Sequence, residues 1–99
     1  MKKINKLVRD KIPSLIESEG RRTITRIYND DEFIDAAKQK LVEEMNEYIE
    51  SGNLEELADL VEVANAIGGD ELNKARKEKN DKNGDFSTHT CLISIDSDT

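Results

Sequence analysis

Residues 29–67 read NDDEFIDAAKQKLVEEMNEYIESGNLEELADLVEVANAI, and this stretch decides the fold. Apolar side chains recur at the three- and four-residue spacing of an amphipathic helix on both sides of Gly52. Residues 29–31 supply N-terminal caps for the first helix, and Gly52 is a natural stop after Ser51. The sequence therefore predicts two antiparallel helices joined by a tight turn.

Four carboxylates lie on or beside the apolar faces of these two helices. Placing residues about 100° apart around the axis puts Glu44 inside the apolar stripe and Glu47 at its rim. The second helix, expected to reach Ile67, has Glu56 in its stripe and Asp59 just beyond. An ionised carboxylate taken out of water needs a compensating cation. Because the helices run antiparallel, the two pairs are expected to meet as an oxygen-only cluster that suits Mg²⁺ or Mn²⁺.

The same carboxylates have a simpler interpretation as a solvated acidic face. Asn53 is followed by Glu56 at the spacing of a capping box, in which the Glu56 side chain would bind backbone and not metal. Glu43 and Glu50 are predicted to point away from the apolar stripe, toward solvent. The sequence leaves both interpretations of Glu56 open.

Two further helices are expected outside this stretch. The first covers about residues 12–19 and ends at Gly20, with proline in its first turn. The second covers about residues 71–83 and follows a break at Gly68 and Gly69. We therefore expect a mainly α fold, a helical bundle that oligomerisation completes.

Two segments, residues 22–28 and 86–95, are rich in β-branched side chains. We expect both to be extended, and to pair either with each other or with a partner chain. With no linker, repeat or low-complexity tract between the elements, residues 1–99 are expected to form a single domain.

Composition limits the partners that such a chain can have. Only 35% of the 99 residues are apolar and 37% are charged, so we expect self-association, as a dimer or tetramer, to cover apolar surface. The net charge of −7 argues against nucleic acid as a partner. Cys91 is the only cysteine, which favours a reducing, cytoplasmic location, and no apolar run suggests a signal peptide or membrane span.

The order of these motifs resembles a known family. A Glu-Glu-x-x-Glu helix at 43–47, a Glu-x-x-Asp helix at 56–59 and a following basic segment resemble the MazG-like, all-α nucleoside triphosphate pyrophosphohydrolases. NKLVRDKIP at 5–13 and ARKEKNDKNGDF at 75–86 look like its phosphoribosyl-ATP pyrophosphohydrolase-like branch. The resemblance implies Mg²⁺-dependent cleavage of a nucleoside triphosphate between the α and β phosphates, which yields a monophosphate and pyrophosphate.

The resemblance also implies roles for individual residues. The metal ligands of the catalytic site would be Glu44, Glu47, Glu56 and Asp59. Phosphates would be bound by Arg76, Lys79 and Lys82, with Arg9 and Lys11 as secondary candidates. For Arg9, an exposed ion pair with Asp10 is the simpler interpretation. The proton of the attacking water would pass to one of the four carboxylates or to the adjacent Glu43.

Two alternatives to this function remain open from the sequence. One is the phosphoribosyl-ATP pyrophosphohydrolase step of histidine synthesis, which would use the same metal helices. The other is a non-catalytic helical module that binds a nucleotide or a protein without turnover. Clustered like charges disfavour the binding module, because they raise the cost of folding without serving its purpose.

Overall fold

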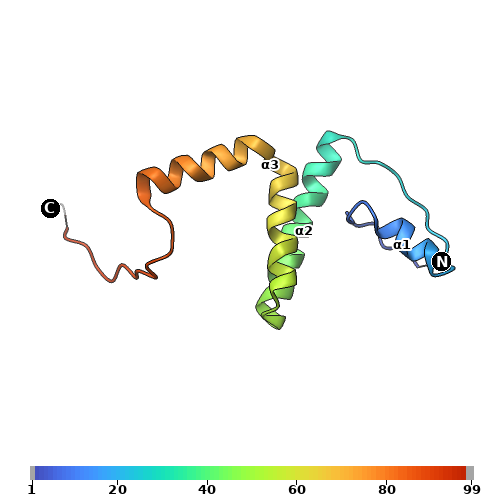
Figure 1. Cartoon of the computed structure of the whole chain (residues 1–99), viewed down its shortest axis with the longest axis horizontal. Coiled ribbons are helices and arrows are strands. Elements are labelled where there is room, and N and C mark those ends of the chain that lie inside the picture. Colours follow the sequence, from blue (N-terminus) through green and yellow to red (C-terminus); the bar gives the residue numbers. More distant parts are fainter. Residues whose placement is uncertain (1, 98–99) are drawn as a thin grey trace.

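The computed structural model describes residues 2–97, and in that range it contains three helices and no strand (Figure 1). Helix α1 spans Ile12–Ser18, α2 spans Asp30–Ser51 and α3 spans Leu54–Asn83. Helices α2 and α3 pack against each other as a hairpin, and α1 contacts neither of them. No helix among the described residues is long and apolar enough to cross a membrane. The protein is mainly α-helical, as its sequence predicts.

A capping box begins α2 at the predicted position. The Asn29 side chain accepts a hydrogen bond from the Glu32 backbone N–H at 2.9 Å, and the Glu32 carboxylate accepts one from the Asn29 N–H at 3.1 Å. Arg26 donates to both carboxylate oxygens of Glu32, at 3.2 and 3.0 Å, while its guanidinium lies over the Tyr28 ring. These contacts satisfy free N–H groups at the helix start and fix where α2 begins.

The turn between α2 and α3 consists of Gly52 and Asn53. Gly52 has a φ of 68°, a left-handed conformation that glycine adopts without steric cost, and its N–H donates to the Tyr48 carbonyl at 2.8 Å. So short a connection makes α3 fold back along α2. The predicted antiparallel hairpin is confirmed.

Helix α3 bends at Gly69, whose φ of 52° and ψ of −135° lie outside the helical region. A side chain at the preceding Gly68 would collide with Leu72. Beyond this bend the second part of α3 leads away from α2 (Figure 1). The break predicted at these glycines is therefore present, and the two helical segments expected on either side of it meet at this kink within α3.

Residues 22–28 and 86–95 do not form strands. Most of their side chains are exposed, including those of Ile24, Ile27 and Ile93. A β-branched composition favours a strand only where a neighbouring strand supplies backbone partners, and no described segment of the chain provides one for either stretch. The expected pairing of these two segments with each other is wrong, whereas pairing with a partner chain stays a prediction.

A single chain buries very little of its apolar surface. Among residues 2–97, Ala37 is the only buried apolar side chain. The hairpin exposes a row of large apolar side chains, namely Val42, Met45, Ile49, Leu54, Leu57, Val61 and Ile67. We call these seven residues the apolar face. The molecule measures 65 × 30 × 24 Å along its principal axes, an elongated arrangement that leaves the apolar face exposed to solvent.

Candidate metal-binding site

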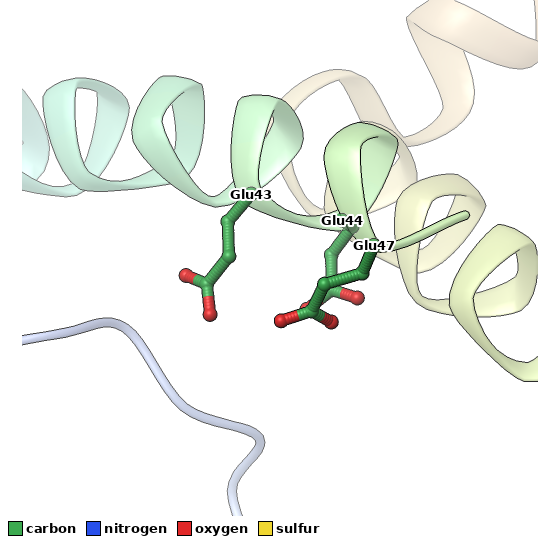
Figure 2. A group of neighbouring side chains, drawn as sticks. All are labelled: Glu43, Glu44 and Glu47. Carbon is green, nitrogen blue, oxygen red and sulfur yellow. The ribbon is translucent and has the colours of Figure 1, made fainter. Parts of the chain in front are cut away.

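Carboxylates from α2 and α3 converge on one side of the hairpin. Glu44, Glu56 and Asp59 each place one carboxylate oxygen within 4.8 Å of the others, and Glu43, Glu44 and Glu47 form a second such group. Figure 2 shows the three α2 carboxylates projecting from the same side of that helix. Glu44 belongs to both groups, so it joins them into one acidic cluster. The four residues predicted as ligands are thus brought together.

Glu44 is the buried member of the acidic cluster, with 4% of the residue exposed. Its Oε1 lies 3.4 Å from the Lys40 ammonium, while its Oε2 is buried and has no hydrogen-bond partner among residues 2–97. Burial raises the pKa of Glu44, and the neighbouring charge of Glu47 raises it further, against the opposing effect of Lys40. A cation at Oε2 would offset the cost of burying this oxygen.

Glu56 faces the other carboxylates and not its own backbone. Its contact with the Glu47 carboxyl, together with burial and the proximity of Glu44, raises the pKa of Glu56 to about 7. The predicted capping box is wrong, because Asn53 makes no side-chain cap and its N–H donates to the Ser51 hydroxyl at 3.1 Å. The capping interpretation of Glu56 therefore falls away, and its carboxyl is available to a ligand.

Glu43 also belongs to the acidic cluster, although the helical pattern predicted that it would point to solvent. Its side chain is half-buried, with one oxygen 3.2 Å from the Lys6 ammonium and the other 3.8 Å from that of Lys40. The prediction was wrong because the N-terminal segment passes this side of α2 and supplies Lys6 (Figure 2). The spacing of residues within α2 gives no information about a contact with the N-terminal segment, which is distant in sequence.

Arg9 reaches the acidic cluster from the N-terminal segment. Its Nε and Nη2 both donate to Asp59 Oδ1, at 3.0 and 2.7 Å. The ion pair is thus with Asp59 and not with Asp10, as the simpler sequence interpretation had it. Arg9 is the one predicted phosphate contact that this chain places against the predicted metal ligands.

The other basic candidates lie apart from the acidic cluster. Lys11 immediately precedes α1, and its side chain is exposed. The remaining three residues lie beyond Gly69, on the exposed part of α3 that leads away from the hairpin (Figure 1); they are Arg76, Lys79 and Lys82. A single chain therefore does not bring these three cations to its own carboxylates.

Solvent reaches the acidic cluster through an open depression of about 410 Å³ beside Glu47 and Glu56. Glu50 and Ser51 complete its lining. A smaller cavity of about 80 Å³ separates the N-terminal segment from α2, with Lys6 and Lys40 in its wall. The carboxylates at the rim are therefore accessible to a ligand from outside, while Glu44 lies beneath them.

The donor set of the acidic cluster consists of carboxylate oxygens, with no histidine or cysteine among them. Such oxygen donors fit Mg²⁺ or Mn²⁺ better than zinc, and the unpartnered Oε2 of Glu44 fits a ligand position. Comparison of the chain with protein-family models, with curated proteins and with solved structures gives no match. The likeness to MazG-like enzymes therefore stays a prediction that rests on the motifs quoted above.

Proposed function

We propose that this protein is a Mg²⁺-dependent nucleoside triphosphate pyrophosphohydrolase, for which Mn²⁺ can replace Mg²⁺. The reaction consumes one water and cleaves the bond between the α and β phosphates, giving a nucleoside monophosphate and pyrophosphate. The observation that carries the proposal is the buried carboxylate of Glu44, which lies among carboxylates of α2 and α3 and whose Oε2 has no hydrogen-bond partner in the described part of the chain. This environment favours a divalent cation, and phosphoanhydride hydrolysis is chemistry that such a cation supports.

The carboxylates have distinct roles in this proposal. The metal would be held by Glu44, Glu47, Glu56 and Asp59. When bound, Mg²⁺ would polarise the phosphate oxygens and favour ionisation of the attacking water. We assign the proton of the attacking water to Glu43, because its carboxylate lies in the acidic cluster without being one of the four proposed ligands.

Cations are needed to stabilise the charge that develops on the leaving pyrophosphate. Arg9 is the candidate within the same chain, since it already lies against Asp59. The cations beyond Gly69 would serve the acidic cluster of a second copy, because their part of α3 leads away from its own hairpin.

A second copy of the chain is also the proposed cover for the apolar face. The contact between α2 and α3 covers little apolar surface, since Ala37 is the only buried apolar side chain among residues 2–97. Helical bundles become stable when further helices cover such a face. A dimer or tetramer would therefore complete the core and bring the distal α3 cations to a neighbouring site. We place the protein in the cytoplasm, in keeping with its single cysteine.

The test is to incubate the purified protein with a panel of ordinary and modified nucleoside triphosphates and with phosphoribosyl-ATP, with and without Mg²⁺. Pyrophosphate and orthophosphate are measured separately. We expect pyrophosphate only in the presence of metal, and an at least hundredfold loss of rate in Glu47→Gln, since the remaining carboxylates hold the metal less well. The control is Glu62→Gln, which changes an exposed carboxylate on α3 and should retain the full rate.

Each alternative predicts a different result in the same assay. Turnover of phosphoribosyl-ATP alone would identify the histidine-synthesis reaction. Nucleotide binding without any metal-dependent pyrophosphate would contradict the proposed hydrolysis and support a binding module.

A further inference from the structure

Residues 2–11, which we call the N-terminal strap, lie against the hairpin and are joined to it by ion pairs. Two ion pairs link the strap to the acidic cluster, from Lys6 to Glu43 and from Arg9 to Asp59. Ile4 is 55% and Val8 39% exposed, while Leu7 is half-buried and lines the small cavity beside α2, so apolar burial supports this contact at Leu7. Helix α1, which follows the strap, contacts neither α2 nor α3.

Both ion pairs use carboxylates that border the same metal position. Asp59 shares one ligand group with Glu44, and Glu43 shares the other. Glu44 adds evidence for a cation there, because no described residue gives its buried Oε2 a hydrogen bond. A divalent ion held by this cluster would therefore lie close to both cations of the strap.

A divalent ion and the Arg9 guanidinium would compete for Asp59. Arg9 directs two hydrogen bonds to one oxygen, Oδ1, at 3.0 and 2.7 Å, and its side chain remains 56% exposed. An exposed ion pair of this kind is weak, whereas a metal ion draws on several carboxylates at once. The metal ion and the Arg9 guanidinium are both positively charged, so they would also repel each other at this short range.

We propose that a divalent metal ion displaces Arg9 from Asp59, which releases the N-terminal strap and frees the guanidinium for a phosphate of the substrate. The inference rests on the proposed function in that it assumes the metal site. In the metal-free protein Arg9 then neutralises the charge of Asp59. In the metal-bound protein it is free to bind a phosphate. Repulsion between the metal ion and the Lys6 ammonium, which pairs with Glu43, weakens the second ion pair of the strap as well.

The first experiment follows the strap directly by NMR while the full-length protein is titrated with Mg²⁺. The side-chain Nε–H signal of Arg9, assigned by its loss in Arg9→Lys, should shift along the same isotherm as metal binding. Backbone amides of residues 4–9 should become more mobile over that isotherm. The matched control is the Nε–H signal of Arg21, which pairs with Glu19 at 3.0 Å outside the acidic cluster and should not move.

The second experiment measures competition through affinity. Arg9→Gln should bind Mn²⁺ about two- to fivefold more tightly than the wild type, since no side-chain cation must be displaced from Asp59. Arg21→Gln should bind with unchanged affinity. Electron paramagnetic resonance of free Mn²⁺ gives both affinities without an activity assay.

The outcomes separate this inference from the proposed function. If metal binds while the Arg9 Nε–H signal stays in place, the displacement is refuted but the metal site stands. Equal Mn²⁺ affinity in Arg9→Gln and the wild type would refute it too. If neither Mg²⁺ nor Mn²⁺ binds at all, the metal site itself is wrong and the displacement fails with it.

Discussion

The carboxyl group of Glu56 on α3 faces that of Glu47 on α2, and this contact raises the pKa of Glu56 to about 7. The burial of Glu56 and the proximity of Glu44 act in the same direction. Below pH 7 the metal-free protein therefore keeps a proton on Glu56, which relieves repulsion within the acidic cluster. A metal ion would require the deprotonated carboxylate, so its binding must release that proton.

Metal binding is accordingly expected to depend on pH. Affinity for Mg²⁺ should rise by about tenfold per pH unit below pH 7 and level off above it, since one proton is released. Calorimetric titrations in two buffers of different ionisation enthalpy measure the released proton. Glu56→Gln should lose most of this dependence, whereas an unchanged pH profile in that variant would show that another group controls binding.

The same contact predicts the pH dependence of folding in the absence of metal. The folded-state pKa of Glu56 lies above its ordinary value of 4.5, so the folded protein binds more protons than the unfolded chain between these two values. This contribution to stability is therefore present below pH 4.5 and is lost as the pH rises toward 7. Urea unfolding at pH 5 and pH 8 should show that Glu56→Gln gains stability relative to the wild type at the higher pH. The exposed Glu62→Gln should show no such gain.

The hairpin shows where local sequence was sufficient. Asn29 and Gly52 act through backbone groups within four residues, and both ends of α2 lie where the pattern placed them. Glu44 was also predictable, because its position on the helix places it within the apolar stripe. These features depend on short-range geometry that the sequence encodes directly.

The mistaken assignments within α2 and α3 share one physical cause, a competing partner that the helical pattern does not contain, whereas the strand pairing is wrong because no described segment supplies a neighbouring strand. Asn53 and Glu56 have the spacing of a capping box. In the structure, however, the Asn53 N–H donates to the Ser51 hydroxyl, and the Glu56 carboxyl faces Glu47. The helical pattern directs Glu43 toward solvent, whereas in the structure its carboxylate pairs with Lys6 of the strap. The contact between Lys6 and Glu43 joins distant parts of the chain, and a single sequence gives no measure of such a contact.

The kink in α3 leads to a prediction about the sign of a stability change. If the bend at Gly69 is required, Gly69→Ala should destabilise the protein by about 1–3 kcal/mol, because alanine is strained at a φ of 52° and ψ of −135°. If α3 can straighten, the same change should stabilise it by up to about 1 kcal/mol through helix propensity. Urea unfolding determines the sign, and we expect destabilisation. Asp70→Ala, at the adjacent exposed position, is the control.

Self-association through the apolar face is tested by adding charge to it. Ile49 is 71% exposed in the single chain, so Ile49→Lys should cost a monomer almost nothing. If a second copy covers this residue, the buried ammonium should weaken association at least tenfold. Sedimentation equilibrium measures the association constant. Glu50→Lys, at the neighbouring exposed position, should leave association nearly unchanged, and equal behaviour of the two variants would argue against this face as the interface.

The central claim is that a divalent cation binds beside Glu44, and Mn²⁺ binding to wild type, Glu44→Gln and Glu62→Gln tests it most directly. Glutamine keeps the shape of Glu44 while removing a buried charge, so the metal-free variant should remain folded. We predict that Glu44→Gln loses at least about tenfold in Mn²⁺ affinity while Glu62→Gln binds like the wild type. Equal affinity in all three proteins, or no binding by the wild type, would contradict the claim.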